Sequence, residues 1–233
     1  RAIGAGVGRF YLPNIDAGSV PAMLELEARH PDECYAMMGV HPCSIKEDYK
    51  KELAAAEKWL AKRPFAAVGE IGIDLYWDQT FIEEQKEAFN TQTGWAKELG
   101  LPIVIHSRNS MDLVIELLKK AKDERLRGIL HCFSGTLEQA EEIMNLGFFL
   151  GIGGVLTYKN SGLSEVIKQV PLEYLVLETD APYLSPVPYR GKRNESAFIR
   201  VIAEKLAEAK NLDIEAVAAG TTTNVEKIFA KKR

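Results

Sequence analysis

The sequence lacks the features that mark several large classes of protein. No stretch approaches the roughly 18 consecutive apolar residues of a membrane-spanning helix, and the first residues carry no apolar run like that of a signal peptide. Only three cysteines occur, Cys34, Cys43 and Cys132, and no two of them form a C-x-x-C pair. A disulfide framework is therefore not expected. These absences predict a cytoplasmic protein with no membrane partner.

An excess of basic residues is also absent. The chain of 233 residues has 29 lysines and arginines against 33 aspartates and glutamates, which gives a net charge of −4. A strongly basic footprint is typical of proteins that bind nucleic acid by charge alone, so this balance argues against a DNA-coating protein. It leaves open an enzyme that holds a few phosphates through metal ions and local Arg or Lys side chains.

What the sequence does have is a regular alternation of apolar stretches of strand length with helical patterns. Several apolar stretches are nearly continuous, as expected for strands buried on both faces. The expected strands are 7–13, 35–40, 65–73, 102–105, 128–132, 148–156 and 174–177. The expected helices are 21–28, 47–62, 81–98, 111–122, 137–146, 163–170, 194–210 and 213–230. This order predicts a parallel sheet built from βαβ units.

Polar and glycine residues mark the expected helix ends. Ser19, Ser110 and Thr136 precede helical patterns and are suitable N-cap residues. Gly100 and Gly147 lie where helices should stop.

Two observations favour a closed barrel over an open sheet. No G-x-G-x-x-G follows the first strand, so the signature of a dinucleotide-binding sheet is missing. Seven strands are visible, and the chain opens in what reads as the helix before the first of them, so one strand before Arg1 would complete eight. We therefore predict an α/β fold, a (β/α)8 TIM-type barrel whose first strand is missing from this chain, with residues 1–233 forming a single domain.

Polar residues gather at the carboxyl ends of the expected strands, where barrel enzymes place their active sites. Three of the four histidines are among them, whereas His30 precedes Pro31 at a helix end and is expected to be solvated. The expected strand 148–156 carries glycines at its end and no ligand. The strand-end residues are His41, Glu70, His106, His131 and Asp180.

Imidazoles and carboxylates that converge on a barrel mouth suit a divalent metal such as Zn, Mn or Mg. A carboxylate such as Glu70 can bridge two ions, and a pair of ions about 3.5–4 Å apart supports phosphodiester hydrolysis. Taken singly, a strand-end histidine is more often only hydrogen-bonded, and Asp180 before Pro182 has the alternative role of a turn cap. Glu70 lies inside an apolar strand, where an unpaired carboxylate is costly, so the set as a whole favours a metal site.

Several residues are weaker candidates for substrate contact. Arg108 follows His106 by two residues and could hold a phosphate, or it could form an ordinary surface pair. Residues 186–195 concentrate basic side chains, Arg193 among them, beside Tyr189. Such a segment is either a lip for nucleic acid with a stacking aromatic or a solvated basic loop.

The remaining candidate side chains either have two possible roles or are expected to be structural. Tyr76 and Trp77 follow the strand-end Asp74 and either stack bases or pack under their loop. Ser134 has no G-x-S-x-G around it, so it is not expected to act as a nucleophile. Cys132 is expected to be a core residue within a strand.

Six segments together resemble the TatD family of metal-dependent deoxyribonucleases, within the amidohydrolase-like metal barrels. They are GVHP (39–42), VGEIGID (68–74), PIVIHSR (102–108), HCFSG (131–135), ETDAPYL (178–184) and RGKRNE (190–195). They occur in family order over nearly the whole chain, which makes the combination specific. The resemblance implies a (β/α)8 barrel, one or two divalent metal ions and hydrolysis of phosphodiester bonds in DNA by metal-activated water. The implied substrate is DNA, as single strands or 3′ ends, and no obligate protein partner is implied.

The resemblance also assigns roles to residues of this chain. Glu70 would bridge the metals, His106 and His131 would hold the second ion, and Asp180 would hold the first ion and orient the attacking water. Glu70 and Asp180 are thus the implied catalytic residues. His41 would lie near the substrate phosphate rather than ligate metal. The other implied substrate-binding residues are Arg108, Arg193, Asn194 and Glu195.

The sequence departs from the family pattern in two places. The family's H-x-H pair has no counterpart here, and the strand expected before Arg1 is where it belongs. Cys43 stands where many members carry histidine, and Ser196 stands where proline is common, which bears on substrate preference.

Two other functions remain open. The same barrel and metals could hydrolyse a small-molecule amide or ester, which the net charge of −4 mildly favours. The absent H-x-H pair supports a metal-free scaffold with a binding role. The basic segment 190–195 favours the nuclease.

Overall fold

The computed structural model describes residues 1–229, which form two compact units. The first, called here the 9–129 unit, is one continuous segment. The second, called the C-terminal unit, joins residues 1–8 to the chain from residue 130 onward. Among the described residues, no helix combines the length and apolar character needed to cross a membrane.

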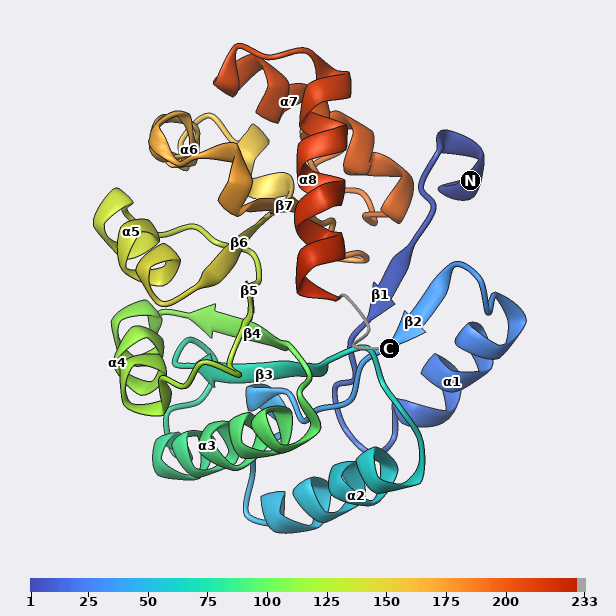
Figure 1. Ribbon diagram of the computed structural model, residues 1–233, viewed down its shortest axis with the longest axis vertical. Coiled ribbons are helices and arrows are strands. Elements are labelled where there is room, and N and C mark those ends of the chain that lie inside the picture. Colours follow the sequence, from blue (N-terminus) through green and yellow to red (C-terminus); the bar gives the residue numbers. More distant parts are fainter. Residues whose placement is uncertain (230–233) are drawn as a thin grey trace. The chain divides into compact units, whose positions relative to one another are not determined.

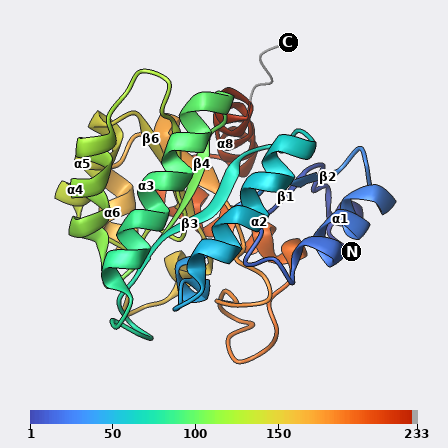
Figure 2. The ribbon, with the colours of Figure 1, turned by 90° about the horizontal axis from the view of Figure 1, so that it is seen from below.

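The 9–129 unit is built on parallel strands with helices between them. β1 (Phe10–Leu12) pairs with β2 (Cys34–Ala36), and β3 (Val68–Asp74) pairs with β4 (Ile103–Arg108), which neighbours β5 (Gly128–Leu130). Beyond β2, a bridge between Met38 and Val68 connects the two groups of strands. The helices are α1 (Val20–Arg29), α2 (Tyr49–Lys62), α3 (Ile82–Leu99) and α4 (Met111–Ala121) (Figure 1). α3 contacts α2, α4 and β3, so the strand has a helical cover (Figure 2).

β3 is the core strand of this unit, because all seven of its residues are buried. Its alignment with β4 places Gly72 opposite His106. A Cβ on Gly72 would lie 2.0 Å from the carbonyl oxygen of His106, so only glycine permits this approach, and its φ of +151° also favours glycine. The close pairing brings the polar residues of β3 and β4 to one edge.

The C-terminal unit has a smaller set of strands than the 9–129 unit. β6 (Phe148–Ile152) pairs in parallel with β7 (Leu175–Leu177). The helices are α5 (Leu137–Asn145), α6 (Leu163–Gln169), α7 (Ile199–Lys210) and α8 (Ile214–Ile228) (Figure 1). The buried Asn224 of α8 donates hydrogen bonds to the carbonyls of Leu172 and Leu175, both at 2.8 Å, which attaches this helix to β7.

The order of strands and helices expected from the sequence is confirmed. The strands are shorter than expected except β4, which extends to Arg108 instead of ending at residue 105. The expected end of the last helix at residue 230 lies outside the described residues. One helix start was wrong: α7 begins at Ile199 rather than at residue 194, after a 3-10 turn at Ser196–Phe198. The reason is that the Asn194 side chain donates to the carbonyls of Thr179 and Tyr183, which holds this residue outside the helix.

Some of the expected helix ends have the predicted capping interactions and others do not. Thr136 forms a capping box with Gln139, and Gly100 ends α3 in the left-handed conformation, as predicted. Ser19 and Ser110 occupy N-cap positions without a capping hydrogen bond from the side chain. Ser110 instead donates to the carbonyl of Ile73 at 2.7 Å.

Candidate active site

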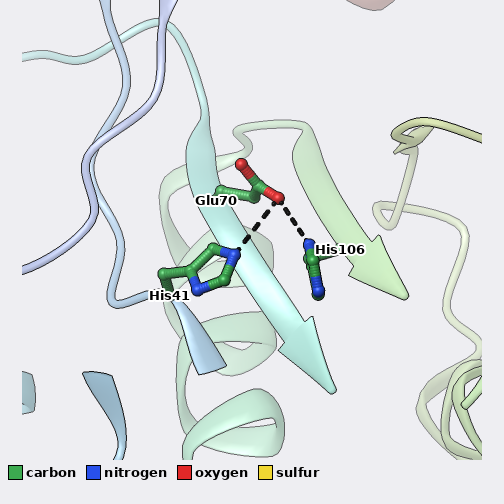
Figure 3. Close-up of side chains that lie close together, drawn as sticks. All are labelled: His41, Glu70 and His106. Carbon is green, nitrogen blue, oxygen red and sulfur yellow. Dashed lines mark hydrogen bonds and ion pairs between the residues drawn. The ribbon is translucent and has the colours of Figure 1, made fainter. Parts of the chain in front are cut away.

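Three of the predicted site residues meet in the 9–129 unit: His41, Glu70 and His106 (Figure 3). Glu70 lies on β3 and is only 5% exposed. Its Oε1 lies 3.0 Å from Nδ1 of His106 on β4 and 3.5 Å from Nε2 of His41. Each residue offers one potential ligand atom, and the three atoms lie within 4.8 Å of one another. Within this group, Glu70 and His106 can hold a divalent ion through oxygen and nitrogen.

Asp74 orients His106 from the other side of the ring. Its Oδ2 lies 2.9 Å from Nε2 of His106. Burial raises the pKa of Asp74, but hydrogen bonds from His106 and from the backbone N–H groups of Trp77 and Tyr76 hold it well below the usual range. The ionised carboxylate is a hydrogen-bond acceptor for an N–H at Nε2, and Nδ1 is the ring nitrogen that faces Glu70. A carboxylate behind a ligating histidine is a common feature of metal sites.

His41 is held differently from His106. Its Nδ1 accepts a hydrogen bond from the backbone N–H of Cys43 at 3.1 Å. In the neutral ring the proton therefore resides on Nε2, the nitrogen that faces Glu70. A protonated nitrogen cannot ligate a metal, so this arrangement suits His41 as a proton donor.

A second group lies in the C-terminal unit, at the ends of β5 and β7. His131 Nδ1 is 2.7 Å from Oε2 of Glu178, and its Nε2 is 3.4 Å from Oδ1 of Asp180. The backbone N–H of Cys132 donates to Oε1 of Glu178 at 2.7 Å. This geometry joins two residues predicted from the sequence, His131 and Asp180, with Glu178.

Glu178 and Asp74 received no role from the sequence. Both stand at even spacing from a chosen residue, Glu178 two before Asp180 and Asp74 four after Glu70. For Asp74 the even spacing is the signal that could have found it, because side chains in a strand alternate between faces and Glu70 and Asp74 both lie on β3. Glu178 lies past the end of β7, where strand alternation gives no such signal.

The glycines at the end of β6 make room for Glu178. A Cβ on Gly151 would lie 2.5 Å from Oε2 of Glu178 and 3.3 Å from the Cα of His131. A Cβ on Gly153 would meet nothing closer than 3.5 Å. The end of β6 supplies no metal ligand, but its glycine leaves space for the contact between Glu178 and His131.

Cys132 does not have the role expected for it. β5 ends at Leu130, and Cys132 has a φ of +47°, so it lies beyond the strand and not within it. Its thiol could ligate metal alongside His131 and Glu178. Burial and the charge of Glu178 raise the pKa of this thiol well above its usual value. Because a thiolate is the form that binds metal, the histidine and the carboxylates are the better ligands here.

The predicted substrate-binding residues lie in both units. Arg108 is exposed at the end of β4, in the 9–129 unit. Arg193, Asn194 and Glu195 line a hollow of about 490 Å³ in the C-terminal unit. Asn194 is 2% exposed and its amide nitrogen is engaged by two carbonyls, and Glu195 pairs with Arg1.

The aromatic side chain expected beside the basic segment is partly covered. Tyr189 stacks on Phe198 with ring centroids 4.1 Å apart and planes within 2°. Arg190 lies over the ring of Tyr158, 4.2 Å from its centroid.

Residues 1–230 match the family described as TatD related DNase. The chain belongs to the TatD family. Among its relatives, the metal-dependent hydrolase YabD of Bacillus subtilis strain 168 is 37% identical over 230 residues, covering 98% of this chain and 90% of that protein. The 3′-5′ ssDNA/RNA exonuclease TatD of Erwinia tasmaniensis is 35% identical over 236 residues, covering 98% of this chain and 91% of that protein.

Solved structures confirm the fold class of this TatD-family chain. YjjV, a TatD homologue from Escherichia coli K12, superposes with a TM-score of 0.93 and 32% identity, covering 98% of this chain and 89% of that one. A phosphotriesterase homology protein from Escherichia coli shares the fold alone, with a TM-score of 0.73, 15% identity and coverage of 97% and 86%. The α/β fold of the TIM-barrel type is therefore confirmed, and the single domain over residues 1–233 stays a prediction.

Both groups of side chains fit the divalent metal that a family of metal-dependent hydrolases implies. In the 9–129 unit, His106 lies between two carboxylates, which is the environment of a cation. In the C-terminal unit, glycine leaves space for a carboxylate beside His131. Imidazole and carboxylate ligands suit Zn, Mn and Mg, in line with the donor preferences of these ions.

Proposed function

We propose that this TatD-family hydrolase cleaves phosphodiester bonds in DNA and removes nucleotides from single-stranded 3′ ends. The observation that carries the proposal is the buried group of His41, Glu70 and His106, with Asp74 behind His106. The Erwinia tasmaniensis relative named as a 3′-5′ ssDNA/RNA exonuclease supports the substrate class.

Within this proposal, Glu70 and His106 hold a divalent ion in the 9–129 unit. His131 and Asp180, with Glu178, do so in the C-terminal unit, and Glu70 and Asp180 are the catalytic carboxylates. One or two ions of Mg, Mn or Zn would lower the pKa of water and neutralise charge on a phosphate.

The chain's own residues prepare the site for a phosphate. Asp74 fixes the His106 ring, which keeps Nδ1 directed at Glu70. His41 carries its proton on Nε2, beside Glu70, and can donate it as a hydrogen bond to a phosphate oxygen. Arg108 and Arg193 add exposed positive charge that can pair with further phosphates.

The experiment is degradation of end-labelled single-stranded DNA with Mg or Mn, then with a chelator. We expect chelator-sensitive shortening from the 3′ end, and we expect the Glu70→Ala variant to lose it because the buried ligand is gone. Glu83→Ala is the matched control, since Glu83 is an exposed glutamate of the same unit that pairs with Lys86 on the surface.

The outcome against the proposal is equally defined. A wild-type protein that binds metal but leaves DNA and RNA intact would refute it. Turnover of an amide or ester by that protein, lost in Glu70→Ala, would then assign the site to a small-molecule hydrolase.

A further inference from the structure

We infer that Tyr76, Trp77 and Arg108 form a stacking surface for an unpaired nucleobase of the substrate. This inference rests on the proposed nuclease function and adds a reason for the preference for single strands. The three residues lie at the ends of β3 and β4, beyond the group of His41, Glu70 and His106.

The two aromatic rings are unusually exposed. Tyr76 is 52% exposed and Trp77 is 69% exposed, although burial of such large apolar surfaces is favourable. Neighbouring exposed aromatic side chains on a folded protein commonly mark a contact surface for a ligand. Trp77 is the more exposed ring and offers the larger free surface.

Arg108 organises this surface and adds positive charge. Its guanidinium carbon lies 3.9 Å from the centroid of Tyr76 and 5.3 Å from that of Trp77. The two rings meet edge to face, with centroids 4.9 Å apart. Within residues 1–229 no carboxylate pairs with Arg108, so its charge is available to a phosphate next to the stacked base.

One carboxylate joins this surface to the candidate metal group. Oδ1 of Asp74 accepts the backbone N–H groups of Tyr76 and Trp77 at 2.9 and 3.2 Å, while its Oδ2 faces His106. The backbone of Asp74 is itself fixed, because Gln85 bonds to both its N–H and its carbonyl. The aromatic pair is therefore held in place before substrate binds.

This combination fits a nucleobase better than other flat ligands. A face of aromatic carbon accepts any base, and a neighbouring guanidinium accepts the linked phosphate, so binding needs no particular sequence. A base within a duplex is already stacked and paired, and only an unpaired base can leave to occupy the surface. The expected consequence is tighter binding of single strands than of blunt duplexes.

The test measures binding of labelled oligonucleotides, in chelator so that no turnover occurs. One oligonucleotide carries thymine at every position, and the other has the same length with abasic sites at its 3′ end. We expect the wild-type protein to bind the first more tightly. Trp77→Leu should weaken that binding by about tenfold, as expected for one stacked base, and leave abasic binding within about twofold.

Two further variants make the result specific. Trp77→Phe keeps an aromatic face and should retain most of the affinity. Leu99→Ala removes a 49% exposed apolar side chain at the far end of α3 and should change nothing. Base-containing DNA should also quench tryptophan fluorescence in the wild type more than in Trp77→Phe.

The inference is overturned if wild-type protein binds both oligonucleotides equally, binds neither, or keeps its affinity in Trp77→Leu. Its failure differs from failure of the proposed function. DNA hydrolysis with an unchanged KM in Trp77→Leu would remove the stacking surface and keep the nuclease. Binding of bases through Trp77 without any hydrolysis would keep the stacking surface and remove the proposed nuclease function.

Discussion

Asp74 contacts both His106 of the candidate metal group and the loop that follows β3. One oxygen of its carboxylate faces Nε2 of His106, and the other holds the loop that carries Tyr76 and Trp77. It is 2% exposed and ionised, with a pKa well below the usual range. A neutral residue of the same shape would keep the packing and lose the charge.

The Asp74→Asn variant tests this role. We expect its affinity for Mn²⁺ to fall roughly 10–100-fold, as is typical when the partner of a ligating histidine is changed. Titration calorimetry measures the loss. Asp78→Asn is the control, because Asp78 pairs with Lys46 at 2.7 Å and has no contact with the histidines. Equal affinities in the two variants would contradict the positioning role.

Among the elements, the strand ends decide what can meet. Glycine at the ends of β3 and β6 allows neighbouring main chains and side chains to approach more closely than a Cβ would permit. Gly72 does this for the main chain of His106, and Gly151 does it for the carboxylate of Glu178. The strands therefore carry the residues of the two candidate metal groups, and their glycines set how closely these residues approach one another.

Gly151→Ala is expected to displace the Glu178 carboxylate from His131. The added Cβ would come within 2.5 Å of Oε2, and the flexible end of the glutamate can move away at little cost to folding. We expect at least about tenfold weaker metal binding by the C-terminal unit with a small change in Tm.

Gly153→Ala serves as its matched control, since the nearest atom to its Cβ would be 3.5 Å away. Metal titration with thermal unfolding on both variants provides the comparison. Unchanged metal binding in Gly151→Ala would show that Glu178 is not a ligand.

For the molecule as a whole, metal binding should add to the stability of the fold. The ligands come from separate strands, so an ion that binds only the folded chain favours it over the unfolded one. The candidate groups lie in both the 9–129 unit and the C-terminal unit, so stabilisation is expected in each.

We therefore predict that Mn²⁺ at about one hundred times its Kd raises the free energy of unfolding by about 2.7 kcal/mol. This corresponds to a rise in Tm of roughly 5–10 °C for a chain of this size. Differential scanning calorimetry with and without chelator measures it. Glu70→Ala should show a smaller rise, and an equal rise in both proteins would place the bound metal elsewhere.

The order of the elements, and most of the polar residues at the strand ends, could be predicted from the amino-acid sequence. Continuous apolar stretches and helical patterns are local properties, so the strands and helices could be found without a structure. His41, Glu70 and His106 could be found too, because parallel strands bring their carboxyl ends to one edge.

Which side chains meet, and which partner faces each histidine nitrogen, could be seen only in the folded chain. The roles of Asp74 and Glu178 depend on contacts at 2.9 and 2.7 Å between residues 32 and 47 positions apart. Cys132 was misplaced because its left-handed backbone, just past the end of β5, leaves no mark in the apolar pattern. Whether Tyr76 and Trp77 are exposed was likewise a matter of packing, since the sequence shows two aromatic residues but not what covers them.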